Sequence, residues 1–210
     1  MKRLIARLAR RFPNLAADVA RHFEDEAERS LLSQLVYVLE SQGVWAMAVY
    51  RFGRWTYQEG PRGAASVPFK ATYHALHKAV EVATGVVLPA SAEIGPGLLI
   101  SHPGTIIVHP DTRIGARCSV GQDTTIGTTG RGGDGVPSIG DDVFLGSGCR
   151  VLGGVSIGDG ASVGANAVVL KDVPAYHTAV GVPAQVVPRR SIVPPVVGLG
   201  PSSRGRKGEP

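Results

Sequence analysis

Histidine is the side chain best suited to proton transfer at neutral pH, and this sequence of 210 residues contains six of them. His102 stands in the segment Ile100-Ser101-His102-Pro103-Gly104, and His109 follows shortly after it. A neutral imidazole can take the proton of a hydroxyl group that attacks a carbonyl carbon. A lone histidine can equally be structural or merely exposed, so its surroundings must decide its role. The other four lie in segments that favour helices or near the end of the repeat described next: His22, His74, His77 and His177.

The surroundings of His102 are a repeat in which an aliphatic residue recurs at every sixth position. This period fits neither the turn of a helix nor the alternation of a simple strand. It predicts a hexapeptide β-helix, in which each short strand points one aliphatic side chain into a narrow triangular core. His102 is not at an inward position, so we expect it to project outward. The series, with a two-residue step before Val108 and an insertion before Ile139, is Leu88, Ile94, Ile100, Ile106, Val108, Ile114, Val120, Ile126, Ile139, Leu145, Val151, Ile157, Val163 and Val169.

Glycine follows eight of these aliphatic positions, and we expect it at the corners because it adopts backbone angles that other residues resist. The eight are Gly95, Gly115, Gly121, Gly127, Gly140, Gly146, Gly158 and Gly164. Residues 128–138, Thr-Thr-Gly-Arg-Gly-Gly-Asp-Gly-Val-Pro-Ser, interrupt the repeat without ending it. We expect this segment to leave a corner as a loop. A Gly-rich loop on a rigid scaffold is a candidate functional element, with a neutral surface insertion as the alternative.

Residues 1–83 have a different pattern and predict a helical N-terminal domain. Helical spacing begins over residues 14–50, Gly43 is expected to break that helix, and an aromatic-rich helix is expected over Val44–Tyr57. A further helix is expected over about residues 68–83. We interpret the aromatic residues as helix–helix and subunit packing. Such a domain would cover the open end of the first coil of the β-helix.

The predicted fold class is therefore α+β, a helical cap followed by a parallel β-helix. The β-helix is expected over residues 84–190, with a strand and turn closing it around Gly181-Val182-Pro183-Ala184. Residues 191–210 are rich in Pro, Gly, Ser and basic residues, so we expect a disordered tail.

Composition excludes several classes of function. The formal charge of +5 is concentrated near the two ends of the chain, and the repeat lacks the basic structured face that nucleic-acid binding requires. No apolar run is long enough for a membrane span or a signal-peptide core. Cys118 and Cys149 have no CxxC spacing and occupy repeat positions usually held by small residues. We interpret both cysteines as structural and expect a cytoplasmic protein that binds neither nucleic acid nor membrane.

Zinc between subunits is an alternative use of outward histidines on a β-helix. It would require several imidazoles that converge at tetrahedral distances. His102 and His109 are the only histidines of the repeat before His177. We therefore expect no metal.

The segments IGPGLLISHPGTIIV, TIGTTGRGGDGVPSIGDDVFLGSGCRVLGGVSIGDGASVGANAVVLKDVP and GVPAQVV resemble the serine acetyltransferase family of hexapeptide acyltransferases. The resemblance covers about residues 84–188, and the segment VWAMAVYRFGRW is similar to part of that family's N-terminal domain. It implies a left-handed β-helix, a homotrimer or a dimer of trimers, and active sites in grooves between chains that bind acetyl-CoA.

The resemblance also implies roles for individual residues. His102 matches the catalytic base, and Ser101 and Asp134 match positions at the acceptor. Small residues in the cofactor groove would allow the pantetheine chain to approach closely. The positions that match the cofactor groove are Gly127, Thr128, Ser147, Gly164, Ala165 and Lys171.

Four positions depart from the family pattern. Val87 stands where the family has the aspartate that pairs with its histidine, and Ser101 stands where an aspartate often precedes that histidine. Gly135 and Val136 replace the Arg-His pair that contacts the amino-acid substrate. A carboxylate held by Arg and an ammonium held by Asp are the physical means of selecting serine.

Three functions follow from these observations. The first is an acetyl-CoA-dependent O-acetyltransferase whose acceptor is serine, a sugar or another small hydroxyl compound. The second is a catalytically silent β-helix that only binds, and the third is a zinc lyase. In the family, the tail that docks into cysteine synthase ends in isoleucine, whereas this chain ends Lys207-Gly208-Glu209-Pro210, so no such docking is expected.

Overall fold

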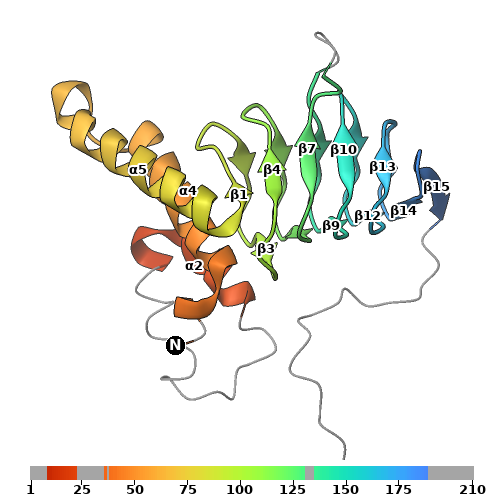
Figure 1. Cartoon of the computed structure of the whole chain (residues 1–210), viewed down its shortest axis with the longest axis horizontal. Helices are drawn as coiled ribbons and strands as arrows, with labels where there is room; N and C mark the ends of the chain where they lie inside the picture. Colours follow the sequence, from red (N-terminus) through yellow and green to blue (C-terminus); the bar gives the residue numbers. More distant parts are fainter. Residues whose placement is uncertain (1–8, 23–35, 37, 131–134, 189–210) are drawn as a thin grey trace, which may run out of the picture.

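The structure is a computed structural model that describes residues 9–22, 36, 38–130 and 135–188. Helices gather at one end of the molecule and a stack of parallel strands forms the rest (Figure 1). The helices are α2 (Pro13–Arg21), α4 (Gln42–Gln58) and α5 (Val67–Thr84), with a 3-10 turn η1 (Gly63–Ser66) before α5. Within the described residues, no helix is long and apolar enough to cross a membrane.

The described strands form three sheets, and consecutive strands from β1 to β14 belong to different sheets. Sheet A contains β1 (Val86–Val87), β4 (Ile106–Val108), β7 (Thr125–Gly127), β10 (Arg150–Leu152) and β13 (Val168–Val169). Sheet B contains β2 (Glu93–Ile94), β5 (Arg113–Ile114), β8 (Ser138–Ile139) and β11 (Ser156–Ile157). Sheet C contains β3 (Leu99–Ile100), β6 (Ser119–Val120), β9 (Phe144–Leu145), β12 (Ser162–Val163), β14 (His177–Val180) and β15 (Gln185–Pro188). All pairs are parallel except β14 with β15, so the chain is a three-sided parallel β-helix as predicted.

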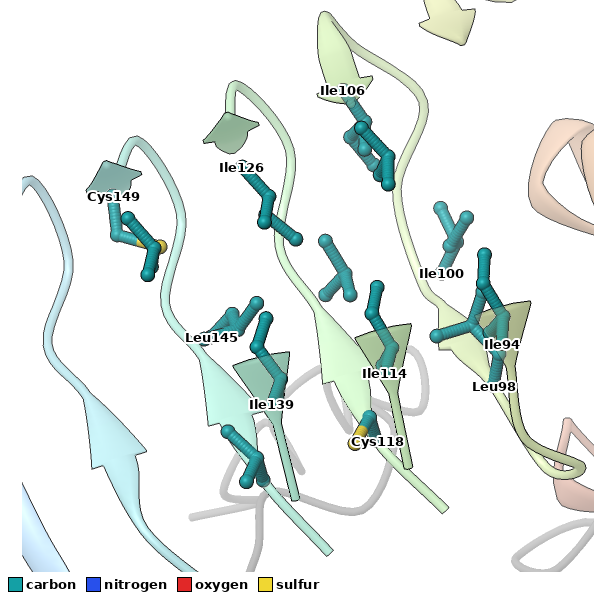
Figure 2. Close-up of a cluster of buried hydrophobic side chains, with 14 of the residues drawn as sticks. Ile94, Leu98, Ile100, Ile106, Ile114, Cys118, Ile126, Ile139, Leu145 and Cys149 are labelled. Atoms are coloured by element: carbon teal, nitrogen blue, oxygen red, sulfur yellow. The ribbon is translucent and has the colours of Figure 1, made fainter. Parts of the chain in front are cut away.

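The core of the β-helix is a column of aliphatic side chains enclosed by the three sheets (Figure 2). Each sheet contributes at least one aliphatic residue from every coil, such as Ile126, Ile139 and Leu145 from the third coil, and all three are buried. Small residues fill the space between them, including Cys118 and Cys149, which are free and buried. The predicted inward series therefore forms the observed core.

The register shows where the chain departs from a regular coil. Ser138 pairs with Ser156, which is one coil of 18 residues later. In the first coil, Leu99 pairs with Ser119 and Ile107 with Thr125, so two extra residues lie between β3 and β4. In the third coil, Ile114 pairs with Ile139 and the extra residues lie between β7 and β8. Both additions sit at corners, and the first of them is the segment that carries His102.

The structural reason for glycine at the eight repeat positions differs from the one expected from the sequence. None of them has a positive φ, whereas Arg117 and Asp142, which are not glycines, occupy left-handed corner positions with φ of 56° and 55°. A Cβ at Gly115 would lie 2.5 Å from the carbonyl carbon of Gly140 in the next coil, and one at Gly146 would lie 2.7 Å from Ala165 N. These glycines are required because consecutive coils are too close for a side chain. Gly127 is an exception, since its Cβ would meet only the Cβ of His109, at 3.9 Å.

The helices cover the open end of the first coil, as predicted, and α4 and α5 pack through their aromatic residues. The ring centroids of Trp55 and Phe69 are 5.6 Å apart, and those of Tyr57 and Tyr73 are 5.9 Å apart. The expectation that Gly43 breaks a helix is wrong, because Gly43 lies in the first turn of α4. A Cβ there would lie 2.2 Å from Ile100 O, so this glycine lets α4 approach strand β3. Residues 23–35 and 191–210, with their predicted helical and disordered segments, lie outside the described residues.

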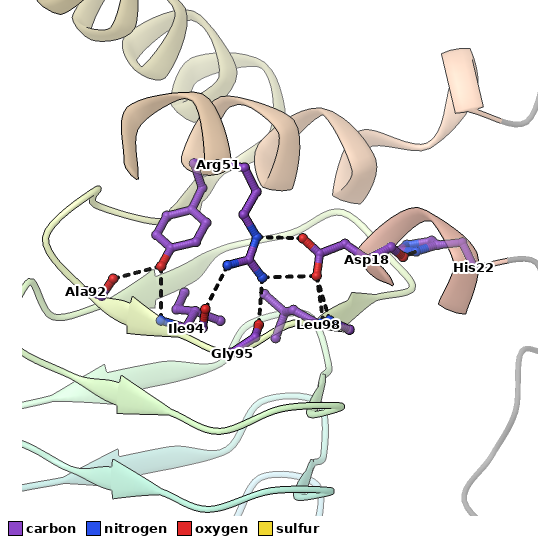
Figure 3. Close-up of polar contacts among 9 residues, drawn as sticks. Asp18, His22, Arg51, Ala92, Ile94, Gly95 and Leu98 are labelled. Atoms are coloured by element: carbon purple, nitrogen blue, oxygen red, sulfur yellow. Dashed lines mark hydrogen bonds and ion pairs between the residues drawn. The ribbon is translucent and has the colours of Figure 1, made fainter. Parts of the chain in front are cut away.

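Side chains of the cap replace the missing neighbour of the first coil (Figure 3). The Tyr50 hydroxyl donates to Ala92 O at 2.8 Å and accepts from Ile94 N at 3.0 Å. Arg51 donates to Ile94 O at 2.7 Å and to Gly95 O at 2.6 Å. These two side chains thereby bond the backbone groups in and beside β2 that a preceding coil would otherwise bond.

A buried ion pair connects the cap to the next corner. Arg51 Nε donates to Asp18 Oδ2 at 2.7 Å, and the two side chains are 8% and 0% exposed. Asp18 Oδ1 also accepts from the backbone N–H groups of Gly97 and Leu98, at 2.8 and 3.0 Å. One carboxylate thus joins α2, α4 and the first coil, and its removal would leave the Arg51 charge buried without its partner.

We predict that Asp18→Asn lowers the free energy of unfolding by about 3–5 kcal/mol, because it leaves a buried cation unpaired. The matched control is Asp142→Asn, which breaks the exposed Arg117–Asp142 pair and should cost less than about 1 kcal/mol. Urea unfolding at one protein concentration, followed by the fluorescence of Trp45 and Trp55 in α4, measures both losses. Equal losses for the two variants would show that the buried pair does not anchor the cap.

Candidate active site

His102 lies at the corner where sheet C passes into sheet A, between β3 and β4. Both Ser101 and His102 are exposed, as the outward position predicted. The segment is held against the end of α5, because Gly104 N donates to Thr84 O at 3.3 Å and Ile106 N donates to Gly85 O at 3.1 Å. His102 therefore stands beside the start of β1, on the rim between the cap and the coils.

Below His102, the same corner continues as a strip of small and polar side chains. Gln122, Ser147 and Ala165 each stand two residues after an inward aliphatic residue of sheet C, as His102 does after Ile100. A Cβ at Gly104 would lie 2.8 Å from Gln122 Cβ, so the segment that carries His102 lies close to Gln122. Ser147 Oγ donates to Gln122 Oε1 at 2.8 Å, and Asn166 N donates to Ser147 O at 2.9 Å.

Three of the residues that match the cofactor groove belong to this strip. Ser147 and Gly164 are half-buried and Ala165 is exposed. A Cβ at Gly164 would lie 2.8 Å from Val180 Cγ1, so a side chain at this position would be too close to Val180. The strip beside His102 therefore presents little side-chain bulk to a ligand.

The remaining matched residues lie at the other edge of sheet A, where it passes into sheet B. Gly127 is buried, whereas Thr128 and Lys171 are exposed. The Gly-rich segment leaves the β-helix at this corner, as predicted, and its far end returns close to the next coil, since a Cβ at Gly135 would lie 3.1 Å from Gly154 Cα. Asp134 lies outside the described residues.

A single chain does not bring these two groups of residues together. His102, Ser147, Gly164 and Ala165 lie at one edge of sheet A, and Gly127, Thr128 and Lys171 lie at the opposite edge. Figure 1 shows the five strands of sheet A side by side between these two edges. A ligand that touches both groups must therefore cross the outer face of sheet A or lie between two chains.

The surface beside His102 is apolar at the position where the family pattern has an aspartate and this sequence has Val87. Val87 is half-buried in β1 and pairs with Ile107 in β4, whose side chain points outward and is 43% exposed. On the Gly-rich segment, Val136 is half-buried and Gly135 is exposed. These four positions offer no charge to a substrate.

His22, His77 and the two cysteines have structural surroundings. Burial lowers the pKa of His22, which contacts the backbone oxygens of Asp18 and Ile100 in the cap. Burial also lowers the pKa of His77 on α5. Burial raises the pKa of Cys118 and that of Cys149 to about 11, so neither thiol forms a reactive thiolate at neutral pH. Among the described residues, no cluster of three or more His, Cys, Asp or Glu side chains could hold a metal ion.

Sequence reasoning missed Gln122, which belongs to the His102 strip. The signal was available, because Gln122 follows Val120 by two residues, as His102 follows Ile100. His109 was noticed but given no role. It lies at the corner between sheets A and B, half-buried next to Gly127, and the residue type alone did not reveal that neighbour.

Comparison with known proteins supports a relationship over most of the chain. The family model described as bacterial transferase hexapeptide (six repeats) matches residues 137–171. The serine acetyltransferase of Escherichia coli K12 is 35% identical over 164 residues, which cover 78% of this chain and 56% of that protein. The chain thus spans little more than half the length of that relative.

Two further relatives extend the match. The serine acetyltransferase of Synechococcus elongatus is 32% identical over 183 residues, which cover 86% of this chain and 70% of that protein. A solved serine acetyltransferase in complex with CoA is 28% identical, with a TM-score of 0.69, over 88% of this chain and 75% of that chain. The fold is accordingly the left-handed β-helix of the hexapeptide transferases, with a helical N-terminal part. From the motifs, the register and these matches together, the chain belongs to the serine acetyltransferase family.

Proposed function

We propose that the protein transfers the acetyl group of acetyl-CoA to the hydroxyl group of a small acceptor, with His102 as the general base. The observation that carries this proposal is the position of His102 at the head of a strip of small side chains along one edge of sheet A. A relative of the same fold has been solved with CoA, and an extended pantetheine chain suits a narrow strip of this kind.

The chemistry needs one base and a polar environment for the carbonyl oxygen. The His102 imidazole takes the proton of the acceptor hydroxyl as its oxygen attacks the acetyl carbon. The carbon–sulfur bond then breaks, and the CoA sulfur receives the proton from the imidazolium. Ser147, Gly164 and Ala165 leave room for the pantetheine chain, Gly127 and Thr128 border it from the other corner, and Lys171 supplies a positive charge for a phosphate.

A homotrimer unites the two edges of sheet A. If sheet A faces a three-fold axis, the His102 edge of one chain lies against the opposite edge of the next chain. The outer face of sheet A suits this contact, because Val87, Ile107 and Val168 point outward from it. Arg150 also points outward, but its guanidinium turns to the carbonyls of Gly148 and Cys149 at the corner. Sheet B instead carries an exposed Glu93–Arg113 ion pair on its outer face.

The acceptor should be neutral or nearly so. A free amino acid is a zwitterion, and each charge that enters a site without a partner loses its hydration at a cost. Val87, Ile107 and Val136 give the described part of the site an apolar wall. L-serine is therefore proposed to be a poor acceptor, and a sugar or other uncharged hydroxyl compound a better one.

We predict that His102→Ala lowers kcat by about 10²–10⁴-fold, because the acceptor hydroxyl loses its base. His74→Ala is the matched control, since His74 lies exposed on α5 and bonds only Tyr57 among the described side chains. Release of CoA from acetyl-CoA at saturating acceptor measures both variants. Near wild-type turnover in His102→Ala would remove His102 from the mechanism.

We predict that Val87→Asp improves the use of L-serine, raising kcat more than it lowers KM. A carboxylate at this position would orient the His102 imidazole and stabilise its protonated form. Val87→Asn has the same shape without the charge and should give little improvement. Steady-state kinetics with L-serine compare the three proteins, and a micromolar KM for L-serine in the unmodified protein would contradict the proposed neutral acceptor.

We predict that Ile107→Asp dissociates the trimer and abolishes activity, because it buries a charge in the proposed interface of sheet A. Ser138→Asp places the same charge on the outer face of sheet B and should leave the trimer intact. Sedimentation velocity reports the assembly of each variant. A monomeric Ile107→Asp protein with full activity would show that one chain contains the whole site.

A further inference from the structure

His109 stands at the same level of the β-helix as His102, on the opposite edge of sheet A. Only strand β4 separates the two corners, so they lie about a third of a coil apart along the chain. Coils stack about 4.8 Å apart, and a third of a coil therefore raises the chain by about 2 Å along the axis. A three-fold axis parallel to the β-helix keeps every residue at its own level, so it brings His109 of one chain to the level of His102 in the next.

The backbone of His109 is fixed by the coil on one side and by its own turn on the other. His109 N donates to Ile126 O at 2.8 Å, and His109 O accepts from Thr112 N at 3.0 Å. The side chain is 32% exposed, and its partner in the next coil is Gly127, which leaves the imidazole unobstructed by a side chain. The ring is thus held at the corner rather than free in solvent.

The hydrogen bond that the His109 ring accepts indicates which of its two nitrogens can donate. Asp111 N donates to His109 Nδ1 at 3.2 Å, so Nδ1 carries no proton and Nε2 carries the hydrogen of a neutral imidazole. The Asp111 carboxylate is 3.9 Å from Nδ1, which is too far for a hydrogen bond. Among the residues that the structure describes, none accepts a hydrogen bond from Nε2. Within the described part of the chain, an oriented N–H donor therefore stands without a partner at the edge of the proposed groove.

We propose, on the basis of the function proposed above, that His109 of one chain completes the active site built around His102 of the neighbouring chain. Its Nε2–H donates a hydrogen bond to the carbonyl oxygen of the acetyl thioester. This oxygen gains negative charge when the acceptor oxygen bonds to the acetyl carbon, and it returns to a carbonyl when the carbon–sulfur bond breaks. A fixed donor at that oxygen favours the transition state over the bound substrate.

The route of the CoA arm supports this placement. Thr128 lies at the same corner as His109 but one coil further from the cap, and Ala165 lies further still on the opposite edge. A pantetheine chain that passes these residues and runs toward the cap presents its thioester end at the level of His102 and His109. His109 thus faces the reacting end of acetyl-CoA rather than its nucleotide end.

The first test compares His109→Ala and His109→Gln in the full-length protein. Loss of one donor to a developing oxyanion lowers kcat by about 10²–10³-fold, and the KM for acetyl-CoA should stay within a small factor of wild type. Glutamine retains an N–H donor and should restore part of kcat. A rise in KM without a fall in kcat, or equal losses for both variants, would overturn the assignment.

The second test asks whether the two histidines come from different chains. His102→Ala and His109→Ala chains are co-expressed in equal amounts, and the whole population of trimers is purified and compared with each variant alone. In random equal assembly, about a quarter of all sites pair an intact His102 with an intact His109 from the next chain. The mixture should therefore reach about a quarter of wild-type activity, although each variant alone is nearly inactive.

The outcomes separate this inference from the proposed function. Activity of the mixture that stays at the average of the two variants would place both histidines in one chain, or give His109 no role, and would overturn the inference. That result leaves the proposed function standing if the wild type releases CoA and His102→Ala does not. A wild-type protein without acetyl transfer would instead overturn the proposed function itself.

Discussion

Every coil of a β-helix must bond its backbone N–H and C=O groups to the coils above and below it, and this requirement governs the molecule. Because the ladders fix the register at each strand, extra residues can enter only at corners. The two residues added before β4 and the segment inserted before β8 do so. The same short distance between coils excludes side chains at Gly115 and Gly146. The first coil has no preceding coil, and Tyr50 and Arg51 of α4 take its place.

This constraint also determines where chemistry can occur. The interior is filled with aliphatic side chains, and most strands of the coils are so short that they carry a single outward residue. Functional groups are therefore restricted to the corners, where His102, Gln122 and Ser147 follow one another down one edge of sheet A. The opposite edge carries His109, Thr128 and Lys171. The three-sided coil keeps these two edges apart, so a ligand that touches both must cross the outer face of sheet A or lie between two chains.

The sequence predicted the β-helix, its core and the place of the insertion, because the six-residue period is a direct consequence of the three-sided coil. It could not predict the reason for the repeat glycines, since the distance between coils depends on three-dimensional packing. Gly43 was misinterpreted for the same reason, because its contact with Ile100 O is distant in sequence. The Asp18–Arg51 ion pair also could not be predicted from the sequence, because neither residue belongs to a recognisable motif. His102 could be proposed as the base from its spacing and its family resemblance, whereas His109 became a candidate only from its position in the three-dimensional structure.

The proposed activity is acetyl transfer at a site that lacks the charges by which an amino acid would be recognised. The most direct test is the rate of CoA release from acetyl-CoA in the presence of L-serine, L-homoserine and a set of sugars and polyols, with the acetylated product identified by mass spectrometry. We expect acceptor-dependent release, an O-acetyl product, and a higher kcat/KM for at least one uncharged acceptor than for L-serine. Release of CoA with none of these acceptors, or a clear preference for L-serine over every uncharged compound, would contradict this proposal.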